Sequence, residues 1–212
     1  VQLACYMKPI YDIGGDFYCY HVFEDGRFAL AIGDVTGKGV PAALLMAASL
    51  SLFDSTFLQR YNPSERLVQL DQALTPYTQP RRQNCAFCYT ELDQRVLSVV
   101  NAGGIPPYVR RASGEVLWPD VGGFALGQGL GAENGYRCVQ YTLAAGDMVI
   151  LVSDGVVEAM DARRTMFGFE RLEQAFARGP MKDAQTMLDY VAREVMAFIG
   201  QAELHDDFTI AV

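Results

Sequence analysis

The chain has 212 residues, 50% of them hydrophobic, which is enough for a core of its own, so we expect residues 1–212 to fold as a single domain. Its formal net charge of −8 at pH 7 argues against nucleic acid as a partner, because an acidic surface repels the phosphate backbone. The sequence contains no apolar run long enough to span a membrane and opens with no secretory signal, so we expect no membrane association.

Alternating apolar and polar residues, bounded by turn residues, predict most of the strands. The expected strands are residues 1–7, 17–23, 27–34, 85–92, 95–101, 108–111, 137–143, 148–153 and 208–212. Glu24-Asp25-Gly26 and Asp93-Gln94 are typical of tight turns between consecutive antiparallel strands.

Helical periodicity and start signals predict helices at residues 42–60, 63–78, 168–178 and 183–199. Pro41 stands where the first helix begins, and we expect this long apolar helix to be buried. Asn62, followed by Pro63 and Glu65, marks the start of the second helix. Because hairpins outnumber β-α-β crossovers, we expect an α+β fold of antiparallel sheets with helices outside them.

The five cysteines are scattered and odd in number. Cys85 and Cys88 have no second pair, and in an alternating strand their side chains point to opposite faces. We therefore expect reduced, structural thiols and a cytoplasmic location.

Acidic residues recur where an apolar strand meets glycine or a turn: Asp16, Asp34, Asp154 and the pair Asp206-Asp207. Taken singly, each is ordinary turn chemistry. Gathered at one place, they would repel one another unless a cation neutralised them, and oxygen ligands in that number suit Mg²⁺ or Mn²⁺ better than Zn²⁺. The first hypothesis is therefore a metal-dependent phosphoryl enzyme.

The residues around these acids carry a resemblance in chain order. The segments are Gly14-Gly15-Asp16-Phe17-Tyr18, Gly33-Asp34-Val35-Thr36-Gly37-Lys38-Gly39-Val40-Pro41, Asn101-Ala102-Gly103, Ser153-Asp154-Gly155 and Asp206-Asp207-Phe208-Thr209. Together they closely resemble the bacterial protein phosphatase 2C-like (PPM-type) serine/threonine phosphatases. Within that group, the sequence is most similar to the sporulation and stress-response phosphatases that dephosphorylate anti-sigma factor antagonists. The likeness runs from about residue 8 to residue 212.

The resemblance implies an α-β-β-α sandwich of two antiparallel sheets, with two Mn²⁺ or Mg²⁺ ions at one edge. It makes Asp34 the carboxylate that bridges both ions and the Val35 carbonyl a ligand of one. Asp154 and Asp206 would complete the shell of the other ion, and Asp16 would bind directly or through a water. Asp207 is either a further ligand or a group that orients Asp206. Asp16, Asp34, Asp154 and Asp206 are thus the expected catalytic residues.

The implied function is hydrolysis of phosphoserine or phosphothreonine on a regulatory protein, namely a phosphorylated anti-sigma factor antagonist. The chain opens without an initiator methionine, and we expect it to be the C-terminal part of a longer protein. The resemblance implies an N-terminal sensory or receiver domain in that protein and a homodimer. The alternative is a catalytically weak or inactive module that only docks the partner.

Some positions depart from the pattern of the relatives. Gly104 stands where a histidine often follows Asn-Ala-Gly, and Cys19 stands where an aspartate commonly follows Phe-Tyr. Thr36 stands where eukaryotic members place a histidine that donates a proton, although the bacterial group commonly lacks it. His21 is expected to be structural, and His205 to occupy a loop or capping role. We expect Lys38 to be exposed to solvent rather than to contact the phosphate of the substrate.

Overall fold

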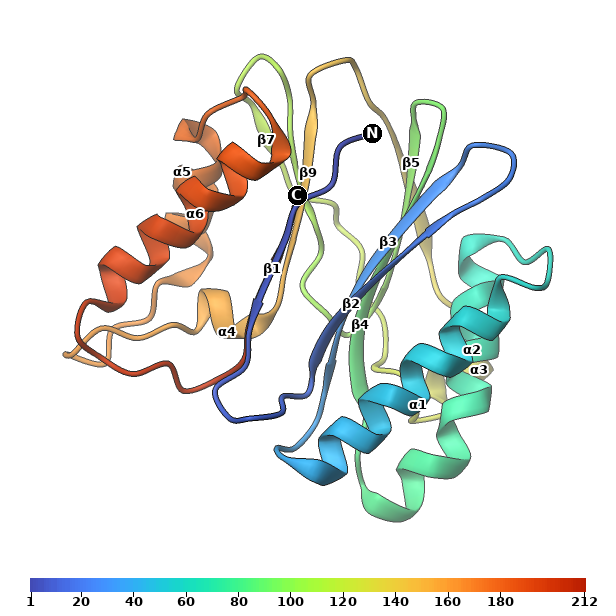
Figure 1. Ribbon diagram of the computed structural model, residues 1–212. Helices are drawn as coiled ribbons and strands as arrows, with labels where there is room; N and C mark the ends of the chain where they lie inside the picture. The colour runs from blue at the N-terminus through green and yellow to red at the C-terminus, as the bar shows by residue number, and fades with distance from the viewer.

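The computed structural model describes residues 1–212 as two five-stranded antiparallel sheets stacked face to face (Figure 1). The β10 sheet has the strand order β1 (Cys5–Lys8), β10 (Phe208–Ala211), β9 (Met148–Val152), β6 (Tyr108–Arg110) and β7 (Val116–Leu117). The β3 sheet has the order β2 (Asp16–Val22), β3 (Phe28–Val35), β4 (Cys85–Asp93), β5 (Val96–Ala102) and β8 (Cys138–Thr142).

Helices cover the outer face of each sheet (Figure 1). On the β3 sheet lie α1 (Val40–Thr56) and α2 (Pro63–Thr78), followed by the 3-10 turn η1 (Gln79–Arg81), and α3 (Leu130–Asn134) lies beside α2. On the β10 sheet lie α5 (Gly168–Arg178) and α6 (Ala184–Ile199), and the short α4 (Asp154–Val157) follows β9. The predicted α+β sandwich with helices outside the sheets is confirmed.

Local sequence signals account for the best-predicted boundaries. The side chain of Asn62 accepts a hydrogen bond from the amide of Glu65 at 3.0 Å, and the Glu65 carboxylate accepts one from the amide of Asn62 at 2.9 Å. This capping box starts α2 at Pro63, as predicted. In the β2–β3 hairpin, Gly26 takes the φ of 89° that the tight turn requires.

Hydrophobic side chains form three clusters, one at each interface between layers. The two outer clusters, between a sheet and its helices, contain 19 and 17 buried residues, and the cluster between the sheets contains 9. The cluster between the sheets is therefore the smallest of the three. Cys85 belongs to the cluster beneath α1 and α2, whereas Cys88 belongs to the cluster between the sheets, which confirms their predicted opposite orientation. All five cysteines are free.

Helix α1 differs from its prediction in length and in burial. It ends at Thr56 rather than at residue 60, where the hydroxyl of Thr56 donates back to the carbonyl of Phe53 at 2.6 Å and competes with the helical bonds. Only one face is buried, through Ala42, Leu45, Ser49, Phe53 and Thr56. The prediction of a buried helix was wrong for the opposite face, where Leu44 is 68% exposed.

Several short elements were not predicted from the sequence. They are β7, α3, α4 and η1. The first strand begins at Cys5 rather than at residue 1, and just before it the backbone of Ala4 is hydrogen-bonded to that of Val212.

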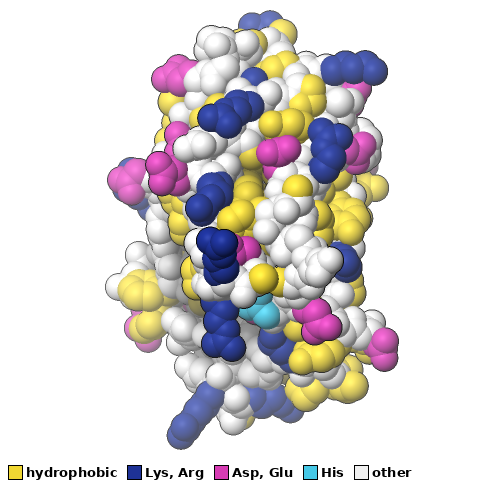
Figure 2. Space-filling model, turned by 90° about the vertical axis from the view of Figure 1, so that its left-hand side faces the viewer, with side chains coloured by type: hydrophobic (Ala, Val, Ile, Leu, Met, Phe, Trp, Pro, Cys, Tyr) yellow, Lys and Arg dark blue, Asp and Glu magenta, His cyan; other side chains and the backbone are white.

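None of the helices is both long and apolar enough to cross a lipid bilayer. Figure 2 shows the face formed by α5 and α6, where Lys and Arg side chains are interspersed with Asp and Glu. This outer face is an ordinary solvated surface of mixed charge.

Candidate metal centre

Asp16 and Asp34 face each other across two neighbouring strands. In the β2–β3 register, Asp16 is the direct partner of Asp34, at the end of the hairpin away from its turn. Asp16 is 3% exposed, and its Oδ2 accepts a hydrogen bond of 2.6 Å from the hydroxyl of Thr209 on β10. The β10 sheet therefore helps to fix a carboxylate that belongs to the β3 sheet.

Asp154 and Asp206 come from the β10 sheet at the same end of the sandwich. Asp154 is the first residue of α4, directly after β9, and Asp206 lies just before β10, which pairs with β9. The two segments approach so closely that a Cβ on Gly155 would lie 1.9 Å from the carbonyl oxygen of Asp207. Only glycine allows this approach, which brings the two aspartate-bearing turns together.

The protonation of these aspartates is coupled. Burial raises the pKa of Asp34 to about 7, and the neighbouring charges of Asp154, Asp16 and Asp206 add to the effect. Burial also raises the pKa of Asp16 to about 7 and raises the pKa of Asp154, to which the charge of Asp206 contributes. The structure thus brings all four predicted catalytic aspartates within electrostatic reach of one another.

A small cavity of about 110 Å³ lies between Asp34 and Asp154. Gly103 and Gly104 also line it, and the loop that carries them is held by Asn101. The Asn101 amide nitrogen donates to the Gly104 carbonyl at 2.9 Å, and its oxygen accepts from the Gly104 amide at 2.9 Å. A Cβ on Gly104 would lie 3.2 Å from the backbone of Phe87, so this wall leaves little space for the histidine found in relatives.

Asp207 supports the backbone of the site. Its Oδ2 accepts hydrogen bonds from the amides of Gly15 at 2.7 Å and Asp16 at 3.3 Å, and its Oδ1 accepts one from the amide of Ile10 at 3.0 Å. Its own amide donates to Oδ1 of Asp206 at 3.0 Å. Both oxygens of the Asp207 carboxylate are therefore engaged by backbone amides, and its role toward a metal stays a prediction.

The loop that follows Asp34 is tied to the segment between η1 and β4. The Thr36 hydroxyl donates to Oδ1 of Asn84 at 2.6 Å, and the Thr36 amide donates to the Asn84 carbonyl at 2.9 Å. The side-chain amide of Gln83 donates to the Thr36 carbonyl at 3.0 Å. These contacts fix the orientation of the neighbouring Val35 carbonyl. Neither Gln83 nor Asn84 was predicted as a site residue, because nothing in their local pattern indicates the contact.

One cation lies beside the acids. Nζ of Lys38 is 3.6 Å from Oδ1 of Asp206 and donates to the His205 carbonyl at 2.8 Å. The Lys38 side chain is 47% exposed, so solvent contact was predicted correctly, but its pairing with Asp206 was not. His21 stacks on Phe57 with ring centroids 4.1 Å apart, as its predicted structural role requires.

The oxygen atoms near the four aspartates are the donors available to a divalent cation. No three His, Cys, Asp or Glu side chains converge on one point closely enough to hold a metal, so the carboxylates would have to turn inward around an ion. The available donors are carboxylate oxygens and the Val35 carbonyl, with no thiol or imidazole among them, and these fit Mg²⁺ or Mn²⁺. Like charges that raise the pKa of Asp34 are the charges that such an ion would neutralise.

Solved bacterial structures share this fold. The SiaA-PP2C domain of Pseudomonas aeruginosa superposes with a TM-score of 0.88 at 23% sequence identity, covering 99% of this chain and 84% of that one. The PP2C phosphatase domain and a fragment of the regulatory domain of SpoIIE from Bacillus subtilis superpose with a TM-score of 0.82 at 19% identity, covering 99% of this chain and 61% of that one. They confirm the predicted protein phosphatase 2C-like sandwich.

Sequence relatives lead to the same group. Phosphoserine phosphatase RsbU of Bacillus subtilis (strain 168) is 28% identical over 216 residues, which cover 100% of this chain and 62% of RsbU. Phosphoserine phosphatase RsbP of the same strain is 29% identical over 128 residues, 58% of this chain and 30% of RsbP. The chain therefore spans about three fifths of RsbU. The pattern of the stage II sporulation protein E (SpoIIE) family matches residues 24–212, and the chain belongs to this family of protein phosphatase 2C-like domains.

Proposed function

We propose that the chain is a Mn²⁺- or Mg²⁺-dependent phosphatase that hydrolyses phosphoserine or phosphothreonine on a regulatory protein. The observation that carries the proposal is the meeting of aspartates from both sheets at one end of the sandwich. There, burial and the charges of Asp154, Asp16 and Asp206 raise the pKa of Asp34 to about 7. Such a group of carboxylates is unfavourable for folding and is best explained by a cationic ligand.

The residues divide into groups that would hold the ions and groups that position those ligands. Asp16, Asp34 and the Val35 carbonyl from the β3 sheet, with Asp154 and Asp206 from the β10 sheet, would hold two ions. When bound, such ions neutralise the phosphoryl oxygens and acidify a water nucleophile. Thr209 fixes the rotamer of Asp16 through its hydrogen bond to Oδ2, and Asp207 holds the amides of Gly15 and Asp16 in place.

The thiols argue against the competing chemistry of a cysteine nucleophile, which serves phosphotyrosine phosphatases. Burial raises the pKa of Cys5 to about 11 and that of Cys88 to about 12. Burial likewise raises the pKa of Cys19, Cys85 and Cys138, so no thiolate is available at neutral pH. Serine or threonine phosphate is therefore the proposed substrate class, as the names of RsbU and RsbP as phosphoserine phosphatases support.

The decisive experiment measures phosphate release from a phosphoserine-bearing anti-sigma factor antagonist, the proposed partner in the cytoplasm. Release should require Mn²⁺ or Mg²⁺, stop with chelator and survive alkylation of the thiols. A matched phosphotyrosine protein should be a poor substrate. Tight binding of the phosphoprotein without any release in Mn²⁺ would instead establish the non-catalytic docking module, and loss of activity on alkylation would overturn the metal mechanism.

We further propose that an N-terminal sensory or receiver domain of the same protein controls the site through α1 and α2, with dimerisation of the linker. Helix α1 begins just after the Asp34 loop, and its outer face carries Val40 and Leu44, 63% and 68% exposed. Pressure on this face would move the loop that holds Asp34 and Val35. The test compares Mn²⁺ titrations of activity for residues 1–212 and for the full-length protein in its signalled state. Equal metal affinity and turnover in both would place control elsewhere, for example in substrate access.

A further inference from the structure

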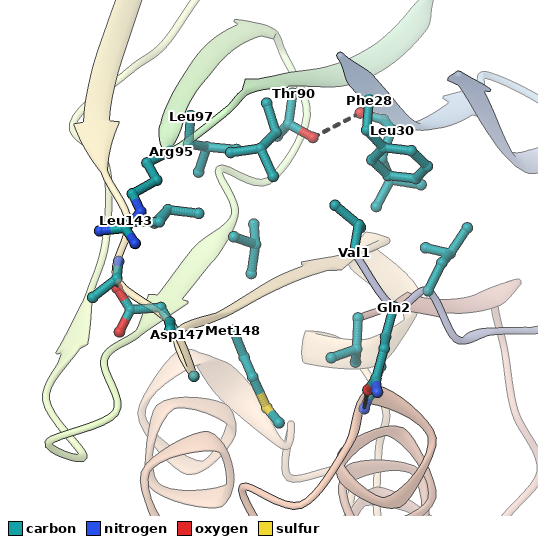
Figure 3. A pocket seen from close by; sticks show the side chains of 18 of the residues that line it. Val1, Gln2, Phe28, Leu30, Thr90, Arg95, Leu97, Leu143, Asp147 and Met148 are labelled. Atoms are coloured by element: carbon teal, nitrogen blue, oxygen red, sulfur yellow. Dashed lines mark hydrogen bonds between the residues drawn. The ribbon is translucent and has the colours of Figure 1, made fainter. Parts of the chain in front are cut away.

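A second cavity lies between the sheets at the end of the sandwich opposite the aspartates. It has a volume of about 570 Å³ and lies beside the first residues of β3 and β9, the β4–β5 turn, the β8–β9 connection and the loop before α6. Figure 3 shows side chains around it, among them Leu30 and Leu97 from the β3 sheet and Val1 from the segment before β1. Asp34 lies at the other end of β3, so this cavity is separate from the candidate metal centre.

The lining is apolar and only partly covered. Phe28, Leu92, Leu143 and Val149 line the cavity and are half-buried, although they pack against the cluster between the sheets. Interiors of folded domains are normally packed without voids of this size. Pockets that hold small ligands, in contrast, have volumes of about 300–1,000 Å³ and mainly hydrophobic walls. The volume and lining are those of a ligand pocket.

The uncharged polar side chains that line the cavity are the exposed Gln2 and Gln94 and the buried Thr90. The hydroxyl of Thr90 is already used, since it donates to the Leu30 carbonyl at 2.9 Å (Figure 3). The part of a ligand that enters between the sheets must therefore be a hydrocarbon, because a buried polar group would stay without a hydrogen bond.

The charges that line the cavity point to an anionic end on that ligand. Asp147 is paired with Arg111 at 2.7 Å, and Asp183 lies 3.9 Å from Lys182. Arg95 makes no side-chain hydrogen bond or ion pair, and it stands at the wall of the cavity beside Leu143 (Figure 3). Arg95 is thus the charged lining residue whose charge is not matched within the protein.

We propose that this cavity binds a monoanionic amphiphile of medium chain length, with its hydrocarbon tail between the sheets and its carboxylate at Arg95. A fatty acid is the simplest molecule of this class. The tail would cover the half-buried side chains on both sheets, and the guanidinium would pair with the head group at the exposed mouth. The proposal does not depend on the phosphatase reaction, because it concerns the opposite end of the sandwich.

Calorimetric titration of the intact protein with decanoate and with decanol tests the proposal. Decanoate should bind saturably to one site per chain. Arg95→Gln should weaken decanoate binding by about fivefold, as expected for loss of an exposed ion pair, and should leave decanol binding unchanged. Arg137→Gln is the matched control, since Arg137 precedes β8 at the end away from Leu143, and it should change neither titration.

Leu143→Trp supplies an independent variant, because the half-buried Leu143 side chain has the cavity in front of it and the indole would occupy the space of the tail. It should abolish binding of both molecules while the far-UV CD spectrum stays native. Decanoate that fails to bind the intact protein, or that binds Leu143→Trp as tightly as the natural chain, would overturn the proposal. Equal effects of Arg95→Gln on decanoate and decanol would overturn the assignment of an anionic ligand.

Discussion

The two ends of the sandwich are built from the same strands and packed in opposite ways. Strand β3 runs from Phe28, at the open cavity, to Asp34, and β9 runs from Met148 at the cavity to the turn that carries Asp154. At the aspartate end the backbones approach so closely that only glycine fits at residue 155, and at the other end aliphatic side chains leave a cavity of about 570 Å³. Close backbone packing therefore holds the aspartates in place at one end, and loose packing is confined to the apolar end.

The largest expected effect is the loss of phosphate release when one charge is removed at the aspartate end. Asp34→Asn changes the volume of the side chain little but removes a carboxylate whose pKa is raised by the charges of the other three aspartates. We expect Mn²⁺-dependent phosphate release to fall by at least about a hundredfold, with a native far-UV CD spectrum. Asp154→Asn should behave in the same way.

The matched control for this loss is Asp93→Asn, which removes the same charge from the exposed β4–β5 turn at the cavity end. It should leave phosphate release within about twofold of the natural chain, since long-range effects of exposed charges are screened. Full activity of Asp34→Asn in chelator would contradict the metal mechanism.

The next effect tests how tightly the aspartate end is closed. Gly155→Ala places a methyl group 1.9 Å from the Asp207 carbonyl oxygen and must separate α4 from the start of β10. We expect the free energy of unfolding, measured in urea, to fall by about 3 kcal/mol or more. Gly122→Ala is the control, because a Cβ at Gly122 meets no atom within 4 Å, and it should change the value by less than about 0.5 kcal/mol.

A smaller effect concerns pH. In the folded, metal-free chain, the pKa of Asp16 and that of Asp34 are raised to about 7, whereas an unfolded aspartate titrates near pH 4. Between these values the folded state holds more protons than the unfolded state, so stability falls as the pH rises from about 4 to about 7 and then levels off. Urea unfolding in chelator should give a free energy lower at pH 8 than at pH 5 by at least about 2 kcal/mol, the contribution of one such group.

The variant Asp34→Asn should differ from the natural chain in its stability and in its pH dependence. Without metal at pH 8 it should be more stable than the natural chain, because one of the mutually repelling charges is gone, and its pH dependence should be weaker. Saturating Mn²⁺ should reverse the order of stability. A natural chain that is equally stable at pH 5 and pH 8 in chelator would show that neither burial nor the neighbouring charges raise the pKa of Asp16 and Asp34 in solution.

The sequence predicted what local patterns determine. The start of α2 followed from Asn62, Pro63 and Glu65, and the positions of the four aspartates followed from strand ends and glycine. The resemblance then predicted the sandwich fold and the roles of the aspartates. The structure and the relatives confirm the sandwich fold. The ligand roles of the aspartates stay predictions.

Contacts between residues far apart in the sequence could not be predicted. Asp207 holds the amide of Gly15 across 192 positions, and Lys38 reaches Asp206 only because α1 and β10 start at the same end of the sandwich. The same holds for the inter-sheet cavity, since the periodicity of a strand shows which side chains face inward but not whether two sheets fill the space between them.

The smallest predicted effect is a change in Mn²⁺ affinity when the contact that supports the loop after Asp34 is removed. Thr36→Val removes the hydroxyl that donates to Oδ1 of Asn84 at 2.6 Å and keeps the shape of the side chain. One exposed hydrogen bond contributes about 1 kcal/mol, so Mn²⁺ affinity, measured by the electron paramagnetic resonance signal of free Mn²⁺, should weaken by about fivefold. Thr36→Ser restores the hydroxyl and should restore the affinity. Asn134→Ala, which removes an exposed side-chain bond to the Leu130 carbonyl in α3, should have no effect. If Thr36→Val and Thr36→Ser bind Mn²⁺ equally well, the Asn84 contact merely accompanies the loop, and the Val35 carbonyl is positioned by the strand alone.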